Sequence, residues 1–140
     1  MKICVLGLGY VGAVSAGCLA KEGHEVIGVD PERAKVDLIN AGRSPIIEKD
    51  LEEIIAEQVA AGRLRATTQL ADAVRHSDLL FVCVGTPSQP NGGIDLKYVR
   101  RVCEQIGATL AAFCNAQRDT LVGSMIPALI MSTYSSVAAL

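Results

Sequence analysis

The sequence predicts an α/β domain built on a parallel β-sheet that helices cover on both faces. The segments expected to form strands are apolar throughout, as in residues 79–84, which is typical of strands buried on both faces. They alternate along the chain with helical patterns, so successive strands are joined by crossover connections. Right-handed crossovers then give a doubly wound, Rossmann-like sheet. The length of 140 residues suits a single domain, and 50% hydrophobic residues can form a packed core.

The first unit is a strand, a helix and a second strand. Residues 2–6 are a short apolar run that ends at Gly7, and residues 26–29 form a second run of the same kind. Between them, residues 10–22 predict a helix that Gly23 ends. The apolar face that we expect this helix to bury carries Val11, Val14, Cys18 and Leu19.

Two helices and a short strand come next. Pro31 and Glu32 are suitable for a helix start, and this helix runs to about Ala41. Asp50 followed by Glu53 resembles a capping box, which predicts another helix start. The apolar stripe of that helix consists of Leu51, Ile54, Ile55 and Val59. Residues 63–67 are a candidate strand, and Leu70, Ala73 and Val74 indicate a brief helix.

The central strand and a long helix follow. Residues 79–84 are expected to form the central strand, and residues 85–94, with two prolines and three glycines, a loop. Asp95 can cap the next helix. Its apolar positions are Leu96, Val99, Cys103, Ile106 and Leu110. Residues 121–126 are a weaker candidate for the last strand.

The end of the chain differs from the rest. Residues 120–140 contain no charged residue, and their apolar residues are mixed with Gly123, Pro127, serines and threonines. A transmembrane helix needs about 20 predominantly apolar residues, and this stretch is too polar and too broken, so we expect no membrane association. We therefore divide the chain into a Rossmann domain, residues 1–119, and a diverged last strand with an uncharged tail, residues 120–140.

Composition excludes several classes of function. A net charge of −2 without a basic patch argues against nucleic acid as a partner. The five cysteines are odd in number, match no zinc spacing and fall mostly in apolar runs. We expect buried free thiols in a reducing cytoplasm, and no metal site. The N-terminus has glycines where an export signal would need a continuous apolar core.

The sequence GLGYVG carries the clearest functional signal. Gly7, Gly9 and Gly12 lie between the first strand and the first helix, and Asp30 ends the second strand. Gly7 permits the tight turn, Gly9 lets a pyrophosphate approach the backbone, and Gly12 lets the helix pack closely. The helix N-terminus favours phosphate. Asp30 can accept hydrogen bonds from both ribose hydroxyls and would repel a 2′-phosphate, which favours NAD over NADP.

Two alternatives remain open for this turn. Asp30 could be a helix cap beside a structural glycine turn, or the site could belong to a methyltransferase, which also uses a glycine turn and an acid. A second candidate is the segment VCVGTPSQPNGGID, residues 82–95, which follows the central strand and should lie at the ligand-binding edge of the sheet. Thr86 in it could contact a cofactor, or it could only stabilise a local turn.

These motifs together resemble a known family. GLGYVG, GHEVIGVDPERAKVDLINAGRSPIIE and FVCVGTPSQPNGGIDLKYV look like the N-terminal domain of the UDP-glucose/GDP-mannose dehydrogenases, over residues 1–112. SPIIE and VGTPS are more specific to that family than the glycines are. GAVSAGCLA and NGGIDLKYV resemble the GDP-mannose branch, which supplies the alginate precursor.

The resemblance implies an activity and a set of site residues. The family oxidises the sugar C6 alcohol to a carboxylate by two hydride transfers to NAD, and a cysteine in a later domain forms the covalent intermediates. It implies that the backbone of Tyr10 and Val11 contacts the cofactor and that Lys35 joins Asp30 at the adenosine ribose. It also places Thr86 beside the cofactor. From the residues alone, Lys35 would be a solvated helix residue.

The chain departs from the family pattern near its end. Alignment on Pro127 puts Ser124 at a cofactor-contacting threonine, with Val122 and Ala128 where the family has arginine and glycine. The sequence stops before the sugar-binding and cysteine-bearing parts, so we expect a truncated domain that is not catalytic alone. A nucleotide sugar would then be a partner only if that domain is supplied, and self-association into a homo-oligomer is expected through the surface that this domain would cover. The alternative is a non-catalytic nucleotide-binding or interaction module.

No residue of the chain is expected to be catalytic. The five cysteines lie in strands, on apolar helix faces or past a helix end, with no setting that would stabilise a thiolate. His24 and His76 are expected in surface loops.

Overall fold

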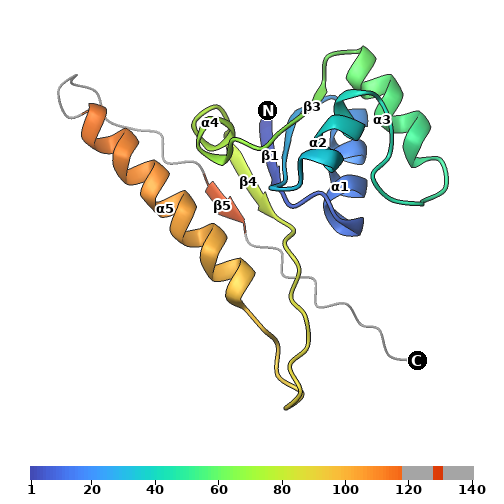
Figure 1. Ribbon diagram of the computed structural model, residues 1–140. Helices are drawn as coiled ribbons and strands as arrows, with labels where there is room; N and C mark the ends of the chain where they lie inside the picture. The colour runs from blue at the N-terminus through green and yellow to red at the C-terminus, as the bar shows by residue number, and fades with distance from the viewer. Residues whose placement is uncertain (118–127, 131–140) are drawn as a thin grey trace.

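The sheet has five parallel strands in the part of the chain that the computed structural model describes, residues 1–117 and 128–130. Their order is β3-β2-β1-β4-β5, which confirms the doubly wound α/β fold (Figure 1). The order reverses between β1 and β4, and this switch point is where ligands bind in such folds. The strands are β1 Lys2–Leu6, β2 Glu25–Val29, β3 Leu64–Thr67, β4 Leu79–Val82 and β5 Ala128–Ile130.

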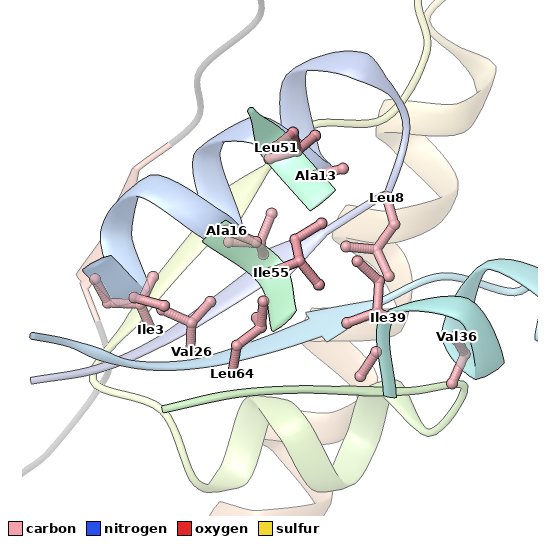
Figure 2. Close-up of a cluster of buried hydrophobic side chains, with 13 residues drawn as sticks. Ile3, Leu8, Ala13, Ala16, Val26, Val36, Ile39, Leu51, Ile55 and Leu64 are labelled. Carbon is pink, nitrogen blue, oxygen red and sulfur yellow. The ribbon is translucent and has the colours of Figure 1, made fainter. Parts of the chain in front are cut away.

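Helices cover both faces of this sheet, as the sequence predicts. They are α1 Tyr10–Lys21, α2 Arg33–Asn40, α3 Leu51–Ala60, α4 Leu70–Arg75 and α5 Lys97–Gln117. Side chains from α1, α2 and α3 form one buried cluster with alternate strand residues such as Val5 and Val26 (Figure 2). Side chains from α4 and α5 form a second cluster with the intervening residues, such as Cys4 and Leu80. β1, β2 and β4 are therefore buried on both faces, which explains their continuous apolar sequences.

The predicted elements occur close to their expected bounds up to residue 117. The prediction of a last strand at residues 121–126 lies outside the described residues. The strand next to β4 is β5, in which Ala128 pairs with Leu79 and Ile130 with Phe81.

The predicted buried face of α1 is wrong for Val11 and Cys18, whereas Val14 and Leu19 do pack against the core. Val11 is 43% exposed and Cys18 is also exposed, whereas Val14 and Leu19 are half-buried. The helix instead buries only its smallest residues: Gly12, Ala13, Ala16, Gly17 and Ala20. The physical reason is close packing, because a Cβ on Gly17 would lie 3.2 Å from Cδ1 of Leu51 on α3. Figure 2 shows the alanines of α1 beside the leucine and isoleucine side chains of α3.

One of the two predicted helix caps is also wrong. Asp50 is the N-cap residue of α3, but its φ is 61° and its side chain makes no capping hydrogen bond. Side-chain capping requires extended backbone at that position, which the left-handed conformation does not provide. Asp95, by contrast, accepts a hydrogen bond from the N–H of Lys97 at the start of α5, with a distance of 2.9 Å.

The cysteines are free, as predicted, but they are less buried than expected. Only Cys4 is fully buried, while Cys18 and Cys114 are exposed. The error at Cys18 has the same cause as the error in the face of α1. His24 is half-buried after α1, and His76 is exposed at the end of α4. None of the helices within residues 1–117 is both long and apolar enough to cross a membrane.

Candidate functional site

The glycine turn joins β1 to α1 at the switch point of the sheet. Gly7 has a φ of +99°, and a Cβ at this position would lie 2.8 Å from the carbonyl oxygen of Cys83. Its N–H donates to the carbonyl oxygen of Val29, at 2.7 Å. The turn therefore runs between the ends of β2 and β4 with space for a hydrogen atom only, so glycine is required here on structural grounds.

Gly12 lies directly over this turn in the first turn of α1. A Cβ on Gly12 would come within 1.7 Å of the carbonyl oxygen of Gly7. No side chain fits at that distance, because the position of a Cβ is fixed by its own backbone and the carbonyl oxygen is a backbone atom, so neither can rotate away. This agrees with the close-packing role that the sequence predicts for the third glycine.

Gly9 differs from the other two glycines, because the space beside it is open. A Cβ there would meet no heavy atom within 4 Å. The first hydrogen bond of α1 runs from the N–H of Ala13 to the carbonyl of Gly9, at 2.8 Å. The N–H groups of Tyr10, Val11 and Gly12 come before it and have no acceptor within the helix. A diphosphate fits this open backbone, with N–H donors and the positive end of the helix dipole beside it.

Asp30 connects the glycine turn to the start of α2. The residue is only 5% exposed. Its Oδ2 accepts from the N–H of Leu8, at 2.8 Å, and its Oδ1 accepts from the N–H of Glu32, at 2.9 Å. A carboxylate can accept about four hydrogen bonds, so each oxygen retains capacity for one ribose hydroxyl.

Lys35 lies beside this carboxylate. Its Nζ is 3.7 Å from Oδ2 of Asp30 and 3.0 Å from Oε2 of Glu32. The hydrogen bond to Glu32 is the main cause that raises the pKa of Lys35, the nearby charge of Asp30 adds to it, and partial burial opposes it. The structure thus brings Lys35 to Asp30, whereas the residues alone indicated a solvated lysine. Sequence analysis missed Glu32, and the only signal was its spacing of three residues from Lys35.

Thr86 follows β4 at the same edge of the sheet. It is half-buried and lies three residues after Cys83, the residue that Gly7 contacts. The loop that it begins extends away from the sheet before α5 (Figure 1). Ser88 and Ile94 form an antiparallel bridge within this loop. The structure therefore supports Thr86 only by its position. The remaining candidate, Ser124, lies outside the described residues.

Two hollows lie away from the glycine turn. One, of about 300 Å³, lies in the segment between α2 and α3 and is lined by Ile46, Ile47 and Glu52. The other, of about 170 Å³, lies beside Lys2, Glu25 and Arg65. Since Lys2 and Glu25 begin their strands, it is at the amino edge, opposite the glycine turn. Neither hollow is lined by the glycine turn, Asp30 or Lys35.

Cys4 in β1 and Cys83, the residue after β4, lack the character of nucleophiles. Burial raises the pKa of Cys4 to about 12 and that of Cys83 to about 11. A reactive cysteine needs the opposite shift. In the described part of the chain, no three His, Cys, Asp or Glu side chains gather to hold a metal ion. What this site offers chemically is recognition of a phosphate and a ribose.

Comparison with known proteins agrees with this geometry. Residues 1–117 match the model of the NAD binding domain of the UDP-glucose/GDP-mannose dehydrogenase family. GDP-mannose 6-dehydrogenase of Pseudomonas putida is 56% identical over 122 residues, which are 87% of this chain and 27% of that protein. The chain thus spans about a quarter of the length of such relatives.

Solved structures show the same relationship. A ternary complex of GDP-mannose dehydrogenase from Pseudomonas aeruginosa is 55% identical with a TM-score of 0.75, over 76% of this chain and 24% of that one. A UDP-glucose dehydrogenase from Pyrobaculum islandicum is 40% identical with a TM-score of 0.76, over 79% of this chain and 26% of that one.

Proposed function

The chain belongs to the UDP-glucose/GDP-mannose dehydrogenase family, as an NAD-binding domain, and we propose that its glycine turn, Asp30 and Lys35 hold NAD for the oxidation of a nucleotide sugar. The observation that carries this proposal is the fixed carboxylate of Asp30. Two backbone hydrogen bonds, of 2.8 and 2.9 Å, orient it beside the open backbone at Gly9.

Each residue has a separate part in holding the cofactor. The N–H groups of Tyr10, Val11 and Gly12 would donate to the pyrophosphate, which approaches over Gly9 because no side chain stands there. Asp30 would accept from the hydroxyls of the adenosine ribose, with Lys35 beside it. Thr86, and Ser124 by alignment only, would contact the cofactor at the ends of later strands. NAD, when bound, accepts a hydride from the alcohol carbon of the substrate.

The proposed substrate is GDP-mannose. Six GDP-mannose 6-dehydrogenases are 51–56% identical to this chain, whereas two UDP-glucose 6-dehydrogenases are 41–44% identical. UDP-glucose is therefore the second choice. We assign no nucleophilic role to Cys4 or Cys83, because burial raises their pKa values and so disfavours the thiolate.

Two further properties belong to this proposal. A reducing compartment, the cytoplasm, is supported by the free cysteines, two of which are exposed. Self-association is supported by apolar side chains around the start of α5, where Ile94 and Leu96 are each 50% exposed and Tyr98 is 44% exposed.

Titration calorimetry of the chain with NAD, ADP-ribose and S-adenosylmethionine tests the proposal. We expect NAD and ADP-ribose to bind and S-adenosylmethionine not to. Gly9→Ala should abolish this binding, because its Cβ would occupy the open space over which the pyrophosphate approaches. The protein should remain folded, because the Cβ would meet no heavy atom within 4 Å and alanine tolerates a φ of −82°. Gly107→Ala on α5 is the matched control, since its Cβ would also meet no heavy atom within 4 Å. Absence of NAD binding at millimolar concentration would contradict the proposal, and a preference for S-adenosylmethionine would point to a methyltransferase.

A further inference from the structure

We infer that Glu32 is a second acid of the ribose site and that it selects against dinucleotides with a 2′-phosphate. This inference rests on the proposed NAD site at Asp30. It assigns a specificity-determining role to a side chain that the glycine motif does not include.

The position of Glu32 is fixed from two sides. Its N–H donates to Oδ1 of Asp30, at 2.9 Å, and its Oε2 lies 3.0 Å from Nζ of Lys35. Glu32 is the N-cap residue of α2, but its side chain makes no capping hydrogen bond. It is free to hold Lys35 instead, three residues further along the helix. The side chain of Glu32 is 59% exposed, so it faces the solvent from which a cofactor would arrive.

The charges at this site decide which cofactor it accepts. A lysine beside the adenosine ribose would by itself attract a 2′-phosphate. Here the ammonium group of Lys35 lies between the carboxylates of Asp30, at 3.7 Å, and Glu32, at 3.0 Å. Two carboxylates and one ammonium leave one negative charge. Arg33, the neighbouring cation on α2, is paired with Asp37 at 3.7 Å. A phosphate dianion would therefore meet net repulsion, and Glu32 supplies the charge that prevents Lys35 from neutralising Asp30.

Glu32→Gln removes this charge with little change in shape. Lys35 would then balance Asp30 alone and be available to a phosphate. A unit charge at about 6–7 Å in a partly exposed site changes an affinity on the order of tenfold. We expect the ratio of the dissociation constants of NADP and NAD to fall by about this factor, through tighter NADP binding. Glu32→Asp keeps the charge and should keep most of the selectivity.

The control is Glu25→Gln, which makes the same change at the opposite end of the strand that precedes Asp30. It should leave the ratio within about twofold, because a five-residue strand separates it from the site by about 16 Å. Adding Lys35→Met to Glu32→Gln should remove the gain in NADP affinity. Titration calorimetry with both cofactors gives each ratio, and circular dichroism confirms that the variants are folded.

The outcomes separate this inference from the function on which it depends. An unchanged ratio in Glu32→Gln, with NAD still bound and still sensitive to Gly9→Ala, would overturn the role of Glu32 alone. The role of Glu32 would also be overturned if the double variant, Glu32→Gln with Lys35→Met, kept the gain in NADP affinity. The gain would then not depend on Lys35. Failure of the unmodified chain to bind NAD would overturn the proposed function, and this inference with it.

Discussion

Replacing Gly12 with alanine tests the closest backbone contact in the candidate site. The added Cβ would lie 1.7 Å from the carbonyl oxygen of Gly7 and 3.3 Å from Cβ of Cys83. An ordinary carbon–oxygen contact is about 3 Å or more, so α1 or the glycine turn would have to move by more than about 1 Å. The turn cannot yield easily, because the N–H of Gly7 is bonded to the carbonyl of Val29.

The expected cost follows from this displacement. Overpacking a well-packed core costs about 1–3 kcal/mol, and a clash between backbone atoms belongs at the upper end. Alanine returns at most about 1 kcal/mol of helix propensity. We therefore expect Gly12→Ala to lower the free energy of unfolding by about 2–3 kcal/mol, a large part of the marginal stability of a small domain. The melting temperature should fall on the order of 10 °C.

Urea unfolding followed by far-ultraviolet circular dichroism measures this difference. The control is Gly107→Ala, also a glycine within a helix, whose Cβ would meet no heavy atom within 4 Å. It should stabilise the protein by about 0.5–1 kcal/mol, because only the helix propensity changes. A Gly12→Ala variant as stable as the unmodified chain would refute the reasoning from the close approach of α1 to the glycine turn.

Three other predictions concern Asp30, Asn40 and Cys4. Asp30→Asn can no longer accept both backbone hydrogen bonds, so it should cost about 1–3 kcal/mol of stability even without cofactor; unchanged urea unfolding would argue against this. Asn40→Ala loses two hydrogen bonds, of 2.9 and 2.7 Å, to the backbone of Ala66 on the edge strand. Hydrogen exchange of the Ala66 amide should be faster in Asn40→Ala than in the unmodified chain. Equal exchange rates would contradict the idea that Asn40 stabilises the edge strand. The thiol of Cys4, with a pKa raised to about 12, stays protonated in the folded chain while the unfolded thiol ionises near pH 8.5. Stability should therefore fall by about 1.4 kcal/mol per pH unit above that point, and Cys4→Ala should remove this part of the slope; parallel pH profiles for the two proteins would show the assignment to be mistaken.

The fold could be predicted because burial on both faces constrains the composition of a strand. A run such as Leu79–Val82 faces a helix layer on each side, so it has no position for a polar residue. Alternation of such runs with helical segments then leaves few topologies. The strand next to β4 was harder to predict from the sequence. β5 is only three residues long, and its sequence, ALI, has no distinctive pattern.

The face of α1 could not be predicted by the rule that large apolar residues are buried. This helix lies so close to the sheet and to α3 that its buried positions admit only glycine and alanine, as at Ala16 and Gly17. Val11 and Cys18 are displaced toward solvent as a result. A pattern of small residues at helical spacing was the available signal, and hydrophobicity scales give it little weight.

The pairing of Glu32 with Lys35 could not be predicted for a different reason. Acids and lysines three residues apart are common on exposed helix surfaces, where they contribute little. What distinguishes this pair is that Nζ of Lys35 also lies 3.7 Å from Asp30, which belongs to the end of a strand. The family resemblance placed Lys35 beside Asp30, but only the three-dimensional arrangement adds Glu32 to this site.

Asp30 shows that a structural role and a binding role need not be alternatives. Its hydrogen bond from the N–H of Glu32, the N-cap residue of α2, fixes the chain just before that helix, which is a structural role. Its hydrogen bond from the N–H of Leu8 holds the glycine turn, and so orients the donors that would meet a diphosphate. Loss of NAD binding in an Asp30 variant would therefore combine a missing ribose contact with a displaced turn. Gly9→Ala separates the two effects, because its added methyl group obstructs only the open space in which the cofactor would lie.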